Sequence, residues 1–335
     1  MSLQHAINNW RTRQTPDEVA LFGAMIDYFN SQSFASVVKA HQTHKHTVSY
    51  TPLPPYDYQW AAYTIGGRIQ KEISDVFFVV FSSRRRIARM THLQAKLKTG
   101  TYQHGQNFSF KLDAGQYHML HNRLEINDHS GKFPNDILSF PLYSDSISSY
   151  GVFYQEPTGK YNMAYEIASL ISTFRTTPYK SPHSQLSHSF VTTKDIGGYV
   201  NKFNDIILPH RHYLCGFCYG QCMDCIQELL STVSIDTFEK ELLNVRIGTR
   251  VDLDLKMLHI IKSIFEKANT PLIGFKEFFQ EQAELLEAID FNRLFNALFR
   301  DEEYHFSHSN NQENEENGGV YILINADEIN NDHLK

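Results

Sequence analysis

The sequence lacks any apolar run that is long enough to cross a membrane. A membrane-spanning helix needs about 20 consecutive apolar residues, and no segment of the 335-residue chain approaches this length. Residues 1–11 also lack the apolar core of a secretory signal peptide. We therefore expect a cytoplasmic protein without a membrane partner.

Cysteine is scarce, and its placement argues against a secreted domain held together by disulfides. All four cysteines lie between Cys215 and Cys225, whereas a disulfide framework spreads its cysteines along the chain. Four thiolates at short spacing can instead hold zinc in a tetrahedral site or an iron–sulfur cluster. Plain burial of the thiols as small apolar side chains explains the cluster as well as zinc does. The candidate ligands are Cys215, Cys218, Cys222 and Cys225, with His210 and His212 as substitutes.

An excess of positive charge is absent as well. The chain has 31 Lys and Arg against 37 Asp and Glu, which gives a net charge of −6 at pH 7. A nucleic-acid partner would therefore have to bind a local basic patch, because the field of the whole protein repels phosphate. Hydrophobic residues at 41% and charged residues at 20% are typical of a soluble globular protein, and the length suggests about two domains.

The strongest structural pattern lies in residues 72–98. Val76–Phe81 is a β-branched and aromatic run that predicts a buried strand, and Ser82–Arg86 is a polar break. Arg89–Leu97 alternates in polarity and predicts a second strand. Because side chains of a strand alternate between its two faces, one face carries His92, Gln94 and Lys96, and the other carries Leu93, Ala95 and Leu97.

A hairpin of these two strands would bring Asp75, at the mouth of the first strand, close to Gln94 and Lys96 on the second. An acid, an amide oxygen and a lysine that converge on one sheet edge are suited to metal-assisted phosphodiester cleavage. On the residues alone, an ordinary hairpin with a surface acid and a surface lysine is the simpler interpretation.

At these residues the sequence resembles the restriction-endonuclease-like PD-(D/E)XK nucleases, and more narrowly their Q-x-K variant found among bacterial anti-phage effector nucleases. The resemblance covers residues 50–100 and two of its positions depart from the commoner pattern. Ser74 stands where proline precedes the acid, and Gln94 stands where a carboxylate is usual. A neutral amide is a weaker ligand for a hard cation than a carboxylate. The residues that carry the resemblance are Glu72-x-x-Asp75, the apolar strand after it, Gln94-Ala95-Lys96, and a preceding helix at Tyr58–Ala62.

The resemblance implies a Mg²⁺-dependent endonuclease, with DNA favoured over RNA as the substrate. Asp75 would bind the metal, and Glu72 would be a nearby second carboxylate. Gln94 and the Ala95 carbonyl would offer further oxygen ligands, while Lys96 would position the attacking water and offset charge on the phosphate. A second copy of the chain or a protein of a defence system are the other partners that the resemblance allows.

Two clusters of basic side chains have both a functional and a plain interpretation. The arginines in and just after the hairpin turn would either clamp phosphates beside the active strands or form a solvated turn. For the histidines, solvated side chains are favoured over a zinc or manganese site, because their spacing matches no metal motif. The clusters are Arg84, Arg85, Arg86 and Arg89, and His41, His44 and His46.

The rest of the chain predicts an α/β fold of the α+β type, with a mixed sheet flanked by helices as in restriction endonucleases and a mainly helical C-terminal region. We expect a nuclease domain at 1–175, a helical domain with the cysteine cluster at 190–306, and a mobile linker with a terminal strand at 307–335. One helix is expected to begin at Thr15 as its N-cap, followed by Pro16 and Glu18. The other expected helices span Asp113–Arg123, Met163–Phe174, Asp252–Ala268 and Phe275–Phe299. The further expected strands are Asp136–Phe140, Ser149–Tyr154 and Val320–Asn325.

Two other functions compete with a nuclease. A nuclease fold that has lost catalysis and only binds nucleic acid, or regulates, is favoured by Gln94 in place of a carboxylate. Metal binding separates these cases, since a binding module needs no Mg²⁺ at the acidic edge. A structural partner protein built on the helical C-terminal half is the third interpretation.

Overall fold

The computed structural model describes residues 1–9, 16–39, 47–53, 67–102, 109–129, 133–139, 147–173, 185–189, 228–252, 254–288 and 320–329. The expected helix at Tyr58–Ala62, the two histidine groups, the cysteine cluster, the linker before the last strand and the end of the Phe275–Phe299 helix lie outside these ranges. Within these ranges, no helix has the length and apolar character needed to span a bilayer.

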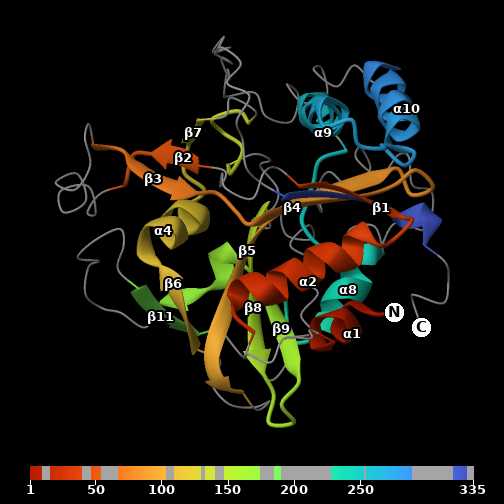
Figure 1. The fold of residues 1–335 in the computed structure, drawn as a ribbon. Helices are drawn as coiled ribbons and strands as arrows, with labels where there is room; N and C mark the ends of the chain where they lie inside the picture. Colours follow the sequence, from red (N-terminus) through yellow and green to blue (C-terminus); the bar gives the residue numbers. More distant parts are fainter. Residues whose placement is uncertain are drawn as a thin grey trace, which may run out of the picture.

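An eight-stranded mixed sheet forms the centre of the fold (Figure 1). Its order is β1-β14-β4-β5-β8-β9-β12, and β13 also pairs with β5. The pairs β14–β4 and β5–β8 are parallel and the others are antiparallel, so the predicted mixed sheet is confirmed. The strands are β1 (Ala35–Lys39), β4 (Val76–Ser82), β5 (Ile87–Thr101), β8 (Ser148–Gln155), β9 (Tyr161–Ile167), β12 (Ser231–Thr232), β13 (Thr249–Arg250) and β14 (Val320–Asn325).

The middle of the sheet is buried on both faces. Every residue of Val76–Ser82 is buried, which explains why β4 is a continuous apolar run. The predicted terminal strand is confirmed, and it pairs in parallel with β4 from Val320 opposite Val76 to Asn325 opposite Phe81. The last described strand of the chain therefore lies in the interior of the sheet.

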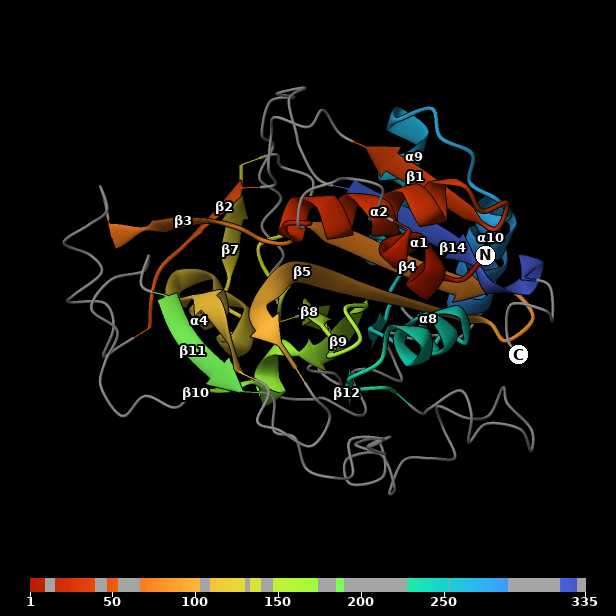
Figure 2. The same ribbon diagram turned by 60° about the horizontal axis from the view of Figure 1, so that its bottom comes forward.

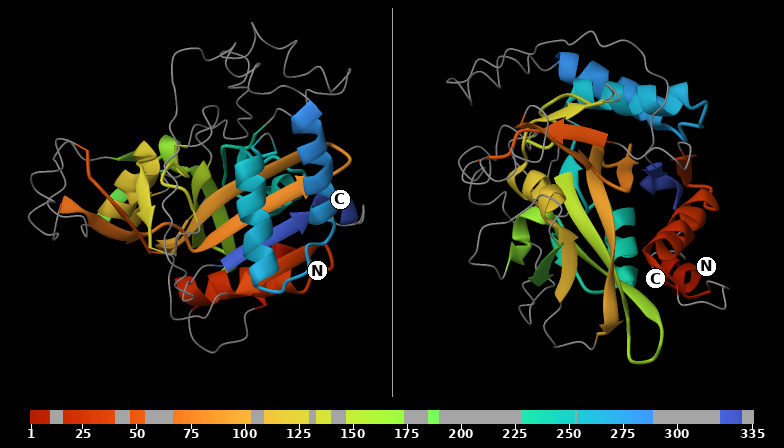
Figure 3. Two further views of the ribbon diagram at one scale, coloured as in Figure 1. Left: turned by 90° about the horizontal axis from the view of Figure 1, so that it is seen from above. Right: turned by 60° about the vertical axis from the view of Figure 1, so that its left-hand side comes forward.

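Helices cover both faces of the sheet (Figure 3). On one face, α1, α2 and α8 pack against residues such as Phe78 and Phe153. On the other, α4, α9 and α10 pack against residues such as Phe77 and Phe81. The helices are α1 (Leu3–Asn8), α2 (Glu18–Asn30), α4 (Ala114–Asn122), α8 (Ile235–Leu243), α9 (Leu255–Lys267) and α10 (Phe275–Ala288), with 3₁₀ turns η4 (Ala168–Leu170) and η6 (Ala326–Glu328).

Two small antiparallel sheets flank the α4 side. One has the order β3-β2-β7 and the other the order β10-β11-β6. Their strands are β2 (Thr47–Tyr50), β3 (Ile69–Glu72), β7 (Ile126–Asp128), β6 (Ser109–Asp113), β10 (Ser172–Thr173) and β11 (Gln185–Ser189). β3 of the first sheet is followed along the chain by β4, and β6 of the second sheet is followed directly by α4.

Three sequence predictions about elements are wrong. The segment with apolar residues at helical spacing, Met163–Phe174, begins as strand β9, whose residues contact the two cores alternately. Because both of its faces are buried, no alternation of polarity marks it as a strand. Residues 135–139 form a turn where Asp136–Phe140 was expected as a strand. Helix α2 is capped by Asp17 and not by Thr15, since Asp17 Oδ1 accepts the Ala20 amide at 2.8 Å.

The sheet continues across the domain boundary that the sequence predicted near residues 175–190. β12 pairs with β9, β13 pairs with β5, and β14 pairs with β4. The described part of the second half therefore supplies strands to the same sheet as well as helices to its surface. The predicted helices at Asp113–Arg123 and Asp252–Ala268 are confirmed as α4 and α9.

Candidate functional site

β5 is longer than β4, and the part of β5 that no longer pairs with β4 lies between α2 on one side and α4 on the other (Figure 2). Val76 of β4 lies opposite Leu93, whereas β5 continues to pair with β8 up to Leu97 and, after a shift in register, again at Thr101. The N–H and C=O groups of one strand residue point to the same side of the strand. The backbone groups of Ala95 and Leu97 therefore face the gap that β4 leaves.

Asp75 closes the first part of this gap. Its Oδ2 accepts the Ala95 amide at 2.6 Å and also a hydrogen bond from the Gln94 side-chain amide. The Asp75 backbone N–H donates to the Leu93 carbonyl at 3.1 Å, which fixes the residue at the mouth of β4. The predicted proximity of Asp75 to Gln94 is confirmed.

Glu18, in the first turn of α2, closes the second part of the gap. Its Oε2 accepts the Leu97 amide at 3.0 Å, and its Oε1 lies 3.5 Å from Lys96 Nζ. The sequence interpretation used Glu18 only as a helix-capping residue and missed this role. An acidic residue beside an N-cap is the only local signal, and it does not reveal contact with a strand 79 positions away.

A hydrogen-bonded chain extends from the site to β3 through α4. The Gln94 amide oxygen accepts from Gln116 Nε2 at 2.5 Å, and the same nitrogen donates to the Glu72 carbonyl at 2.9 Å. Asp113 caps α4 by accepting the Gln116 amide at 2.8 Å, and its other oxygen pairs with Lys71 Nζ at 2.8 Å. Gln116 is a second residue that the sequence interpretation missed, because Asp113-x-x-Gln116 indicates only a helix start.

The carboxyl group of Asp75 is shifted toward the protonated form. The pKa of Asp75 is raised to about 7, mainly by burial and in smaller part by the negative charges of Glu72 and Glu18. The Lys96 ammonium and the hydrogen bond from the Ala95 amide act in the opposite direction. Glu72, the last residue of β3, is therefore close enough to act on Asp75 through its charge.

The donors at this edge suit a hard cation better than zinc. Asp75 offers carboxylate oxygen, and the Ala95 carbonyl points to the same side as the amide that contacts Asp75. Mg²⁺ needs only one or two carboxylates in addition to its waters and substrate. Gln94 differs from the prediction, because its oxygen already accepts from Gln116. Among the described residues, no group of three or more His, Cys, Asp or Glu is arranged to hold a metal.

The arginine turn lies at the opposite end of the hairpin from Asp75. Arg84, Arg85 and Arg86 are exposed, and Arg85 Nη1 donates to the Asn244 carbonyl at 2.7 Å. The seven residues of β4 separate this turn from the site by roughly 20 Å. Of the two interpretations of this turn, the one that places the three arginines beside Asp75 and Lys96 is therefore wrong, whereas the interpretation as a solvated turn is compatible with their exposure.

Arg89 is not available for phosphate binding. Its side chain is 2% exposed, and its Nη1 lies 3.3 Å from Glu228 Oε2 and donates to the Gly248 carbonyl at 2.7 Å. Strand alternation directs Arg89 into the core on the same side as Ile87 and Leu93. This finding corrects the prediction that Arg89 belongs to the phosphate-binding arginines.

His92 shares its strand face with Gln94 but belongs to the core. Its ring is buried and lies 4.6 Å from the ring of Phe77 and 5.8 Å from that of Phe133, measured between centroids. Replacing His92 would therefore disturb the packing of these rings against the sheet.

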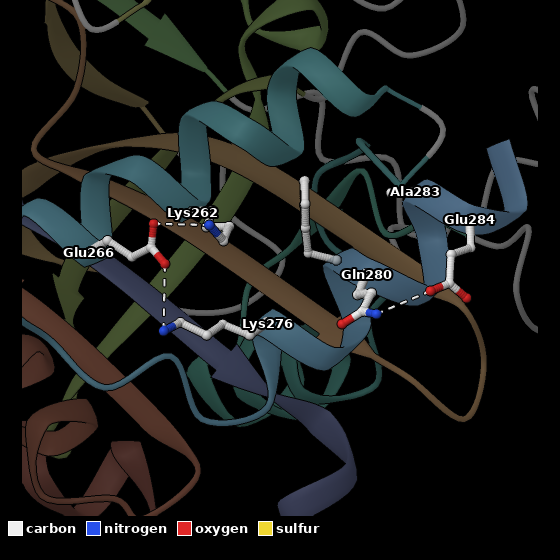
Figure 4. A pocket seen from close by; sticks show the side chains of 7 residues that line it. Lys262, Glu266, Lys276, Gln280, Ala283 and Glu284 are labelled. Atoms are coloured by element: carbon white, nitrogen blue, oxygen red, sulfur yellow. Dashed lines mark hydrogen bonds and ion pairs between the residues drawn. The ribbon is translucent and has the colours of Figure 1, made fainter. Parts of the chain in front are cut away.

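A surface groove between α9 and α10 is separate from this site (Figure 4). Glu266 pairs with Lys262 at 3.1 Å and with Lys276 at 3.6 Å, and Gln280 Nε2 donates to Glu284 at 3.1 Å. These contacts satisfy the charged groups among themselves on an open surface. The groove therefore has the properties of a solvated helix pair, and the edge of β5 is the stronger candidate.

A scan against protein-family models, a search of the curated proteins and a search of the solved structures each found no match to this chain. What the site can do therefore follows from its own geometry and charge.

Proposed function

We propose that the protein is a Mg²⁺-dependent endonuclease that cleaves phosphodiester bonds of nucleic acid, with DNA favoured over RNA by the sequence resemblance. One observation carries the proposal: at the edge of β5 where β4 begins, Asp75 accepts the Ala95 amide, and the Lys96 ammonium is close enough for its charge to lower the pKa of Asp75. The combination of hard oxygen donors with an adjacent ammonium group is what metal-assisted phosphate chemistry requires.

Asp75 and the Ala95 carbonyl would hold the cation, which when bound supplies Lewis-acid activation of the phosphate and of water. Lys96 would offset the negative charge that develops on the attacked phosphate. Glu18 holds the Lys96 ammonium in place at 3.5 Å and ties α2 to β5 through the Leu97 amide. Asp75 has to lose its proton before it can serve as a ligand.

A binding or regulatory module without catalysis is the second candidate. It is favoured by Gln94, whose oxygen is occupied by Gln116, and by Lys96, whose charge is paired with Glu18. Incubation of the purified protein with supercoiled plasmid and with RNA, in Mg²⁺, Mn²⁺ or EDTA, separates the two. Nicking or linearisation that EDTA abolishes supports the nuclease, whereas retention of nucleic acid without any cleavage supports the module.

The pH dependence of cleavage should report Asp75. We expect activity to rise as the pH passes through about 7, because burial holds the carboxyl in its protonated form below that pH. Glu18→Gln should move the midpoint to lower pH, since the Glu18 charge raises the pKa of Asp75 and competes for Lys96. The glutamine oxygen can still accept the Leu97 amide, so α2 should stay in place.

Rates measured from pH 5.5 to 9 at saturating Mg²⁺ check this expectation. Glu266→Gln is the matched control, because that carboxylate also pairs with lysine but lies on α9 away from the sheet edge. A midpoint that stays unchanged or rises in Glu18→Gln would contradict the assignment.

The arginine turn should contribute to affinity and not to chemistry. Replacing Arg84, Arg85 and Arg86 by alanine should reduce the salt dependence of duplex binding by about 0.9 for each phosphate that is no longer neutralised. The cleavage rate at saturating DNA should stay the same, because the turn is roughly 20 Å from Asp75. Lys262→Ala with Lys276→Ala controls for the removal of exposed positive charge. An unchanged salt slope would indicate that the turn is only solvated.

A further inference from the structure

Gln116 makes contacts that a helix-capping residue does not need. It is the third residue of α4 and is buried, and Asp113 already caps its backbone amide. A glutamine at this position usually folds back to the amide of the capping residue. Gln116 instead donates to the Glu72 carbonyl at the end of β3 and to the Gln94 oxygen on β5.

These bonds decide which end of the Gln94 amide faces Asp75. The Gln94 oxygen accepts from Gln116, so its nitrogen is directed to Asp75 Oδ2. In the reversed orientation, two NH₂ groups would meet at Gln116 and two acceptor oxygens would meet at Asp75. Only the orientation with the nitrogen toward Asp75 satisfies all the groups, and Gln94 is buried where water does not offer an alternative partner.

The position of Gln116 is itself well determined. Asp113 holds the first turn of α4 through one oxygen and Lys71 of β3 through the other, each at 2.8 Å. Tyr50 of β2 donates to the Gly115 carbonyl at 2.8 Å. The start of α4 is thus fixed to both strands that precede the site.

We propose that Gln116 is a positioning residue, which holds the Gln94 amide as a hydrogen-bond donor to Asp75 Oδ2 and so orients the Asp75 carboxylate for a cation. The proposal rests on the proposed function of the site. It makes Gln94 a hydrogen-bond donor to the Asp75 carboxylate and not a ligand of the metal. Within the described residues, the groups that donate to the Asp75 carboxylate both reach Oδ2, which leaves Oδ1 for a cation.

The test follows the side-chain NH₂ signals of Gln94 in metal-free protein by NMR, with the signals assigned through Gln94→Met. In Gln116→Met the Gln94 amide is free to turn, so these signals should move away from their wild-type positions as the hydrogen bond to Asp75 is lost. Mg²⁺ binding at pH 7, followed by calorimetry, should weaken by up to about tenfold. Gln282→Met is the matched control, because Gln282 is also a buried glutamine on a helix, α10, and does not contact Gln94.

A second variant keeps the test decisive if Gln116→Met does not fold. Glu is favoured at the third position of a helix, so Gln116→Glu should fold, accept from the Gln94 nitrogen and turn the Gln94 oxygen toward Asp75. Gln116→Glu should weaken Mg²⁺ binding more in the wild-type background than in a Gln94→Met background, where only the added charge acts. Equal changes in both backgrounds, or wild-type Gln94 NH₂ signals in Gln116→Met, would overturn the positioning role. Absence of cleavage by the wild type would remove the proposed function but leave the Gln94 NH₂ signals as a valid test.

Discussion

Asp75→Asn and Lys96→Ala are each expected to reduce metal-dependent cleavage by about a thousandfold or more, while nucleic-acid binding changes little. Both side chains would act on the cation or on the charge of the transition state, and little on the bound ground state. Asparagine can still accept the Ala95 amide, so the mouth of β4 should keep its structure. Mg²⁺ binding should weaken in Asp75→Asn and persist in Lys96→Ala, because Asp75 supplies an anionic ligand to the proposed site and Lys96 supplies no ligand.

Two remote variants are matched controls for these effects. Asp327 resembles Asp75 in accepting a backbone amide, that of Arg84 at 3.0 Å, at the other end of the same hairpin. Lys262 resembles Lys96 in pairing with a helix carboxylate. Asp327→Asn and Lys262→Ala should retain cleavage within a fewfold of the wild type. The nuclease assignment fails if Asp75→Asn cleaves as fast as the wild type, or if no cation supports cleavage by the wild type.

Glu166→Gln is expected to change the pH dependence of stability more than any other single substitution that we can name in the described residues. Glu166 of β9 lies opposite Tyr150 of β8 and Ser231 of β12, and it is 1% exposed. Burial raises the pKa of Glu166 to about 9 from its ordinary value of 4.5. The cost arises because no charged partner compensates the buried carboxylate within the described part of the chain.

The sign of the effect follows from the protons bound in each state. Between pH 4.5 and about 9 the folded protein keeps a proton on Glu166 that the unfolded chain has released. The free energy of unfolding should therefore fall by about 1.4 kcal/mol per pH unit in that window. The stability that the protonated group contributes is fully present below pH 4.5 and is lost as the pH passes through about 9. Asp75 adds a loss of the same sign up to about pH 7.

Urea denaturation at pH 5, 6, 7 and 8 measures this slope. Glutamine has the shape of the protonated acid and does not titrate, so the advantage of Glu166→Gln over the wild type should grow with pH. Glu241→Gln is the control, because the Glu241 carboxylate is also buried but pairs with Arg246 at 3.1 Å; this variant should only lose stability. Parallel curves for the wild type and Glu166→Gln would show that burial does not hold a proton at this position.

Local sequence patterns were enough to predict the hairpin that brings Asp75 to Gln94. The two strands are adjacent in the chain, and a short polar break between them leaves one simple pairing. Alternation then placed Gln94 and Lys96 on one face before any packing was known. The roles of Glu18 and Gln116 were not predictable in this way, because each reaches β5 from a separate helix whose docking depends on the whole core.

Alternation also explains where sequence reasoning failed. β9 is buried on both faces, so its apolar residues satisfied a helical spacing by coincidence, and Glu166 gave no sign of the burial that raises its pKa. Arg89 shows the same limit: an arginine next to an exposed turn was expected in solvent, yet the register of β5 turns it into the core. The periodicity of the chain by itself determined the central strands and the meeting of Asp75 with Gln94. Only the tertiary structure decided which of the polar residues are buried, which carboxylate closes the edge beyond β4, and which end of the Gln94 amide faces Asp75, because burial and hydrogen bonding depend on segments that are distant in sequence.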